Sequence, residues 1–179
     1  MATEMRTRSG FEHAGAGDLH REVEDLVARH AELIDEDRLE EWPELFTEDC
    51  VYKIIARENV DRGLPISAIF CDSRKMLVDR VVSLRQANIY PTHHYRHILS
   101  TTRLDAPQGA AGPGAEPGLI KARTNYVVFQ TRNNGETSIY NAGRYLDEIV
   151  RDEDGALRFK SKLAVFDTNR IDTLMVRPI

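Results

Sequence analysis

Two hydrophobic periods follow one another along the chain, and the change between them divides the sequence into a helical first part and a strand-rich second part. Between residues 18 and 34, apolar and small side chains recur every three or four residues, as in an amphipathic helix. Asp18 is expected to cap this helix at its start. Its buried face is predicted to comprise Leu19, Val23, Leu26, Val27, His30, Leu33 and Ile34.

Two further helical stretches are predicted. Residues 38–46 form a short piece, and Pro43 limits its length because the proline ring removes a backbone donor. The apolar residues Leu39, Trp42, Leu45 and Phe46 are expected on one side of this piece. A second amphipathic helix is expected to begin at Asp72 or Ser73 and to end near 88. Its buried side is predicted to carry Met76, Leu77, Val81, Leu84 and Ala87.

The other segments have the pattern of strands. Residues 50–56 are rich in β-branched side chains, and 64–70 have a strand-like pattern apart from Pro65, which favours a sheet edge. A turn or excursion with Asn59, Asp61 and Gly63 separates the two segments. Four long strands follow, at 92–104, 119–132, 136–151 and 156–167. Asn134-Gly135 and Asp154-Gly155 are typical of two-residue hairpin turns, since both positions favour positive φ. The four long strands are therefore predicted to form an antiparallel meander.

Helices followed by a long meander indicate an α+β fold, with the helices packed on the concave face of a curved antiparallel sheet. This order resembles the cone-shaped sheet of the nuclear-transport-factor-2-like (cystatin-like) superfold, and the cone itself is implied by that resemblance. A chain of 179 residues with 41% hydrophobic residues suits a single domain. We expect that domain at 18–179, a flexible arm at 1–17 and a long surface loop at 105–118.

Composition narrows the classes of function. The net charge of −5 argues against general affinity for nucleic acid, because duplex binding requires a basic face. The chain has no apolar run of about 18 residues and begins with polar residues, which predicts no membrane contact and a cytoplasmic location. Cys50 and Cys71 give no disulfide framework and are expected to be reduced and buried.

An iron–sulfur centre of the Rieske type needs Cys-x-His and Cys-x-x-His motifs. Tyr52 stands two residues after Cys50 and Ser73 two residues after Cys71, so this chain lacks the spacing for such a centre.

The histidines at 93–97 are the remaining candidates for a metal site. A strand would place His93, Tyr95 and His97 on one face and His94, Arg96 and Ile98 on the other. A mononuclear iron site needs a carboxylate beside two histidines, and none follows in this segment before Asp105. The pattern favours histidines that hydrogen-bond within the sheet or at a subunit interface, and a metal site or a ligand pocket are the alternatives.

Acid–base chemistry is a second alternative, because cone-shaped sheets of other families enclose pockets in which an Asp, His or Tyr moves a proton. The side chains that could line such a pocket are Tyr52, Tyr95, Tyr126, Tyr140, Arg144 and Asp167. Sequence does not show that these groups meet, and structural roles between sheet and helices are favoured. A stand-alone isomerase or dehydratase is the functional alternative that such a pocket implies.

Three segments resemble one known family. They are EWPELFTEDCVYKI at 41–54, DSRKMLVDRVVSLRQANIYPTHHYRHILS at 72–100 and AVFDTNRIDTLMVRPI at 164–179. Together they resemble the β (small) subunit of aromatic-ring-hydroxylating (Rieske non-heme iron) dioxygenases. DSRKMLVDRV, RQANIY and YRHIL are most similar to small subunits of aromatic-carboxylate oxygenases, of the terephthalate or salicylate type.

The resemblance implies a noncatalytic structural subunit, with no catalytic, cofactor-binding or metal-binding residue on this chain. It implies a homotrimer alone and an α3β3 assembly with the oxygenase α (large) subunit. The Rieske [2Fe–2S] cluster and the mononuclear Fe(II) are expected on the α subunit, with electrons from NAD(P)H through a reductase. A ligand-binding or scaffold homologue without any enzyme is a third hypothesis.

A permanent partner requires a large surface in which aromatic and arginine side chains serve as anchors. We expect such anchors among a few residues of the helical cover and the long strands. They are Trp42, Tyr95, Arg96, His97 and Arg144.

Overall fold

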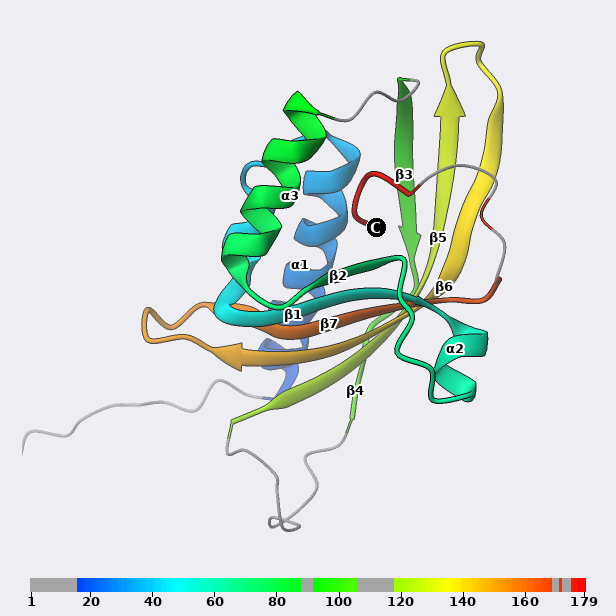
Figure 1. Cartoon of the computed structure of the whole chain (residues 1–179). Helices are drawn as coiled ribbons and strands as arrows, with labels where there is room; N and C mark the ends of the chain where they lie inside the picture. The colour runs from blue at the N-terminus through cyan, green and yellow to red at the C-terminus, as the bar shows by residue number, and fades with distance from the viewer. Residues whose placement is uncertain (1–15, 88–91, 106–117, 169–170, 172–174) are drawn as a thin grey trace, which may run out of the picture.

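The computed structural model describes residues 16–87, 92–105, 118–168, 171 and 175–179. Two long helices, α1 (Ala16–Asp35) and α3 (Arg74–Gln86), lie inside the bend of a strongly curved sheet (Figure 1). Two short helical turns, η1 (Trp42–Leu45) and α2 (Arg57–Asp61), stand before and after the first strand. The predicted α+β class, with helices on the concave face of a curved sheet, is confirmed.

The sheet has the strand order β2-β1-β7-β6-β5-β3, and β4 pairs with β5 off this path. Its strands are β1 (Phe46–Ala56), β2 (Ile69–Cys71), β3 (His93–Leu99), β4 (Arg103–Leu104), β5 (Ile120–Arg132), β6 (Thr137–Arg151) and β7 (Leu157–Phe166). The antiparallel meander through β3, β5, β6 and β7 is confirmed. One pair differs from the expected antiparallel sheet, because β1 runs parallel to β7. The long crossover that a parallel pair needs is available here, since β1 and β7 lie far apart in sequence.

Irregular pairing bends strands β6 and β7 around the helices. The register shifts by one residue at Tyr140 of β6 and at Lys160 of β7. Such bulges bend a strand and increase its twist. Beyond the Tyr140 bulge, β6 approaches β7 so closely that a Cβ at Gly143 would lie 2.0 Å from the carbonyl oxygen of Val165. Glycine is therefore required at this point of the bend.

The helix ends differ in detail from the expected ones. Helix α1 begins at Ala16, so Asp18 lies in its first turn and does not cap it. Ser73 is the predicted cap of α3, and its side-chain oxygen accepts a hydrogen bond from the Met76 backbone N–H at 3.4 Å. Met76 and Ala87 were expected on the buried side but are exposed, Met76 by 41%, while Leu77 and two later residues of that side are buried. The face of α3 toward the sheet is narrower than predicted.

The region after β1 is where the sequence prediction was least accurate. The strand expected at 64–70 is reduced to β2, and the excursion before it contains helix α2. Pro65 lacks a donor for sheet pairing, and the Asn59 side chain binds the Ile66 carbonyl oxygen at 2.8 Å instead. Residues 64–67 are consequently held as an irregular segment outside the sheet, which the Ala68 backbone N–H joins through the Ile54 carbonyl oxygen at 2.8 Å.

Both predicted hairpins exist, but their turns are longer than two residues. Strand β5 ends at Arg132 and β6 begins at Thr137. Only the glycines adopt positive φ, 83° at Gly135 and 84° at Gly155. The preceding Asn and Asp therefore keep ordinary backbone angles, and the extra residues complete each turn.

The core lies between the inner face of the sheet and helices α1 and α3. The predicted buried face of α1 is confirmed, and Cys50 and Cys71 are free and buried, as expected. The last described segment, Met175–Ile179, also lies in the interior. The Tyr52 hydroxyl donates a hydrogen bond to the Ile179 carbonyl oxygen at 2.8 Å, which fixes this segment against β1.

Two predicted segments lie almost entirely outside the described residues. The arm at 1–17, except for its last two residues, and most of the loop at 105–118 lie outside the described residues. Both stay predictions. No helix in the described parts of the chain is long and apolar enough to cross a membrane.

Candidate subunit interface

Three of the five predicted anchors lie inside the subunit. Trp42 and Tyr95 are 0% and 1% exposed, and the side chain of His97 is fully buried. Such side chains have almost no surface left to lose to a partner. The interface prediction is therefore restricted to Arg96 and Arg144, which are both exposed on the sheet.

His97 is buried because it joins the edge strand β3 to the end of α1. Its Nδ1 donates to the Asp35 carboxylate at 2.6 Å, and its backbone N–H donates to the other oxygen of that carboxylate at 2.8 Å. The buried carboxylate thus covers part of an otherwise open sheet edge. The alternation predicted for this strand is confirmed, with His93 inside and His94 outside.

The alternative sites do not assemble among the described residues. Within the described ranges, no group of three or more His, Cys, Asp or Glu side chains could hold a metal ion. Asp167 is 56% exposed at the side chain and pairs with Arg57 at 3.3 Å, and Arg144 faces outward. Tyr52 points inward, and burial raises the pKa of its hydroxyl. The acid is thus exposed at the surface, whereas Tyr95 stacks on Tyr140 at a centroid distance of 5.1 Å and the buried Tyr126 hydroxyl donates to the Asn141 side-chain oxygen at 2.7 Å.

A buried ion pair was missed by the sequence analysis. The Lys162 ammonium lies 3.1 and 3.2 Å from the two Asp147 oxygens, with both side chains fully buried, and 3.8 Å from the centre of the Tyr145 ring. Burial lowers the pKa of Lys162 and raises that of Asp147, while their mutual attraction opposes both shifts. Strand alternation was the available signal, because Asp147 lies between Tyr145 and Ile149 on the inward side of β6.

His30 completes this polar interior. Its ring is surrounded by the aromatic rings of Trp42, Phe46, Tyr52, Tyr145 and Phe159, at centroid distances from 5.7 to 6.3 Å. Burial, and then the charges of Lys162 and His97, hold the pKa of His30 well below its usual value. Five aromatic rings of the core thus surround this histidine.

The outer face of the sheet is different, because it is open over most of its area. Cross-strand neighbours form rows across it. One row runs through Phe70 of β2, Lys53 of β1, Leu163 of β7 and Leu146 of β6. The next row runs through Ile55, Val165 and Arg144. The first row is exposed or half-buried along its length, whereas in the second row Ile55 and Val165 are buried and Arg144 is exposed.

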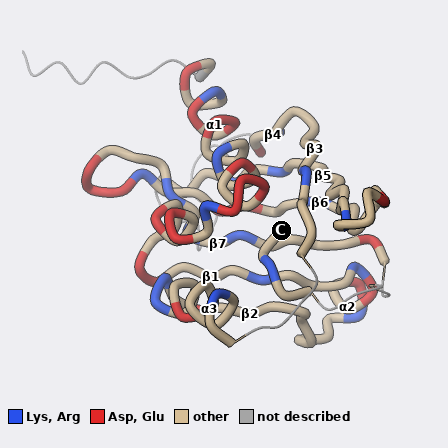
Figure 2. The backbone as a smooth tube through the Cα atoms, turned by 90° about the horizontal axis from the view of Figure 1, so that it is seen from above, with Lys and Arg blue, Asp and Glu red and all other residues tan. Residues whose placement is uncertain are grey.

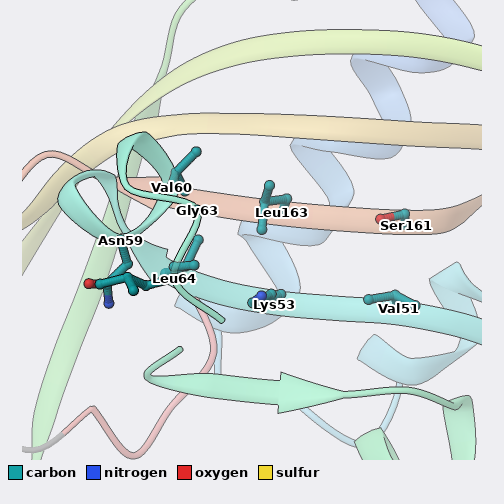
Figure 3. A pocket seen from close by; sticks show the side chains of 9 residues that line it. Val51, Lys53, Asn59, Val60, Gly63, Leu64, Ser161 and Leu163 are labelled. Atoms are coloured by element: carbon teal, nitrogen blue, oxygen red, sulfur yellow. The ribbon is translucent and has the colours of Figure 1, made fainter. Parts of the chain in front are cut away.

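A groove lies on this outer face between β1 and β7. It has a volume of about 360 Å³, and Figure 3 shows Val51 and Lys53 on β1 beside Leu163 on β7. Helix α2 and the turn after it form one end of the groove. The lining residues are Val51, Lys53, Ile55, Asn59, Val60, Gly63, Leu64, Ser161 and Leu163.

Charges of both signs are distributed over the chain, with acidic residues gathered at the turn after α1 and at the β6–β7 hairpin (Figure 2). Most of the outer-face charges have partners, such as Lys121 with Glu148 at 3.4 Å. Lys53 and Arg144 form no ion pair with any described residue. The outer face therefore combines exposed apolar area with unpaired positive charge, which suits a protein partner that carries carboxylates.

Known proteins share this chain's sequence and fold. The family model described as ring hydroxylating beta subunit matches residues 29–173. The chain is 49% identical over 158 residues to the anthranilate 1,2-dioxygenase small subunit of Burkholderia cepacia, covering 88% of this chain and 92% of the relative. It is 39% identical over 155 residues to the terephthalate 1,2-dioxygenase terminal oxygenase component subunit beta 2 of Comamonas sp, covering 85% and 93%.

A solved structure agrees with these matches. The crystal structure of a β subunit assigned to an aromatic-ring-hydroxylating dioxygenase of Novosphingobium aromaticivorans DSM 12444 is 43% identical, with a TM-score of 0.79. The match covers 93% of this chain and 100% of that one. The expected resemblance to small subunits of aromatic-carboxylate oxygenases is thereby confirmed. The chain belongs to the family of ring-hydroxylating β subunits, the small subunits of aromatic dioxygenases that function as part of a complex with an oxygenase large subunit.

Proposed function

We propose that this chain is a structural, noncatalytic β subunit that holds the large subunit of an aromatic-ring-hydroxylating oxygenase in its working assembly. The observation that carries this proposal is the 49% identity to a dioxygenase small subunit over 88% of the chain. The open outer face of the sheet supports it, because a supporting subunit acts through its surface. Arg96 and Arg144 are the proposed interface residues that lie on the surface.

The proposed assembly is an α3β3 oxygenase in the cytoplasm, with a homotrimer when the small subunit is alone. In this assembly the large subunit carries the Rieske [2Fe–2S] cluster and the mononuclear Fe(II). Electrons arrive from NAD(P)H through a reductase. Residues 18–179 act as one structural unit, and 1–17 as an additional arm.

The proposed substrate is an aromatic carboxylate. Support comes from two relatives, whose names specify anthranilate and terephthalate as the compounds on which their oxygenases act. Both compounds carry a carboxylate on a benzene ring. The large subunit is the part of the assembly that would select between them.

Co-expression of this chain with the large subunit from the same organism tests the proposal. We expect the pair to co-purify as an iron-containing complex with the visible absorption of a [2Fe–2S] cluster. The complex should consume oxygen with NADH, a reductase and anthranilate or terephthalate, while the small subunit alone should contain no iron and consume none. Oxygen consumption or substrate turnover by the isolated small subunit would contradict a noncatalytic role.

A further inference from the structure

The groove between β1 and β7, here called the outer groove, has a preformed wall. Gly63 has a φ of 65°, which turns the chain after α2 so that Leu64 reaches the groove. The Leu64 backbone N–H donates to the Asn59 carbonyl oxygen at 2.8 Å, and the Asn59 side chain donates to the Ile66 carbonyl oxygen at 2.8 Å. The wall is therefore held in place before any partner binds, which lowers the entropic cost of binding.

Exposed apolar side chains extend the outer groove on one side. Ile66 is 66% exposed, Phe70 48% and Leu64 40%. Phe70 is the cross-strand neighbour of Lys53, and Lys53 is the neighbour of Leu163. Phe70 beside the groove and the two groove-lining residues therefore form one continuous surface. Helix α3 also exposes apolar residues, Val78 and Val82, but none of them lines this groove. Unlike the exposed apolar residues of α3, the outer groove is recessed, so a side chain of a partner can insert into it.

Lys53 gives the outer groove a charge preference. The charges of the adjacent wall are already paired, Arg62 with Glu58 at 2.9 Å and Arg57 with Asp167 at 3.3 Å. Lys53 lies in the groove floor among apolar side chains and forms no ion pair with any described residue. A cation in such a position favours an occupant that brings a carboxylate, because interface charges fix partner choice and orientation.

We propose that the outer groove receives a segment of the oxygenase large subunit in which an apolar side chain stands next to an Asp or Glu. The apolar side chain enters between Val51 and Leu163, and the carboxylate pairs with Lys53. This inference rests on the proposed function, since it identifies where the large subunit docks. The outer groove lies on the same face of the sheet as Arg144, because Ile55 of its lining, Val165 and Arg144 are cross-strand neighbours, although Ile55 and Val165 are themselves buried.

Charge reversal in the co-purified complex tests this docking. Lys53→Glu is expected to raise the dissociation constant between small and large subunits at least tenfold, and Lys53→Met to raise it less. Lys75→Glu is the matched control, because Lys75 is exposed on α3 away from the groove and has no ion pair with described residues. Thermal unfolding of each isolated small subunit, with midpoints close to the wild type, verifies that the variants fold.

The outcomes separate the two proposals. If the wild-type chain does not co-purify with the large subunit, the proposed function fails and the docking site fails with it. If the wild type co-purifies and Lys53→Glu binds as tightly as Lys75→Glu, only the docking site is refuted.

A photo-crosslinker, p-benzoylphenylalanine placed at Leu163, identifies the occupant directly. A crosslink to a large-subunit peptide with adjacent apolar and acidic residues supports the proposal. A crosslink to a second copy of this chain, with self-association lost in Lys53→Glu, shows that the groove joins small subunits and overturns it.

Discussion

His30 shows how one buried side chain makes the stability of this subunit depend on pH. The pKa of His30 in the folded chain lies well below its usual value, chiefly because burial penalises the charged imidazole. The unfolded chain binds this proton below a pH of about 6.5, which the folded chain does not. Stability is therefore complete above that pH and decreases as the pH falls, by up to about 1.4 kcal/mol per pH unit.

Replacement of His30 by Leu should remove this contribution to the acid slope. Urea unfolding of the isolated small subunit at several pH values between about 6.5 and 5 measures it. His94→Gln is the control, since His94 is exposed on the opposite face of the sheet and its loss should leave the slope unchanged. An identical slope in His30→Leu and wild type would contradict the assignment.

Lys162 and Asp147 form a pair whose members are costly to separate. With both side chains fully buried, Lys162→Met leaves the Asp147 carboxylate without its cation. We expect this change to lower the free energy of unfolding by about 3–5 kcal/mol. The double change Lys162→Met, Asp147→Leu should recover most of the loss, because it removes both charges. Urea denaturation at a fixed protein concentration measures the free energy of unfolding of the single and double variants. Equal decreases in both variants would argue against a stabilising interaction between Lys162 and Asp147.

At the scale of elements, the contact between α1 and β3 is the link between the helical layer and the sheet edge. Asp35→Ala removes the acceptor of both the His97 backbone N–H and the His97 ring N–H. Leaving buried donors unpaired costs about 1–3 kcal/mol. We expect faster amide hydrogen exchange across 93–99, measured by mass spectrometry. Glu36→Ala is the control, since its exposed pair with Arg96 at 3.0 Å contributes little, about 1 kcal/mol at most. Equal exchange in both variants would show that Asp35 does not hold the edge.

The elements that could be predicted from sequence are those with one buried face, because burial of that face sets the spacing of their apolar residues. Helix α1 and the strands β5, β6 and β7 each bury one face, and a regular spacing of apolar side chains records it. Helix α2 has no buried residue, so no such spacing could indicate it. The parallel pairing of β1 with β7 depends on strands far apart in sequence, which local patterns do not encode.

The interface residues were harder to predict because alternation does not say which face of a strand meets the helices. It correctly grouped His93, Tyr95 and His97 on one side of β3. Aromatic side chains serve in cores as well as in interfaces, and here Trp42 and Tyr95 belong to the core. Only Arg96 and Arg144 are exposed, as the interface hypothesis required, because arginines are rarely buried without a partner.

In the whole molecule, the two faces of the curved sheet have different roles, since the inner face forms the core and the outer face is open to a partner. Its inner face is occupied by helices α1 and α3 and by the segment Met175–Ile179, which together stabilise the subunit. Its outer face presents the row through Phe70 and Leu163, together with Lys53 and Arg144, which form no ion pair with the described residues. A partner that covers the outer face can therefore be lost or gained without disturbing the core.

Arg144→Glu tests that separation on the assembled oxygenase. Because Arg144 is exposed and has no ion pair with described residues, the substitution should leave the unfolding of the isolated subunit almost unchanged. It should weaken association with the large subunit about tenfold, and association of the wild type should weaken as salt screens this contact. Arg21→Glu on the exposed side of α1 supplies the matched charge change. Size-exclusion chromatography of the co-expressed complexes at low and high salt measures the difference, and equal losses in both variants would point to net charge alone and against a contact at Arg144.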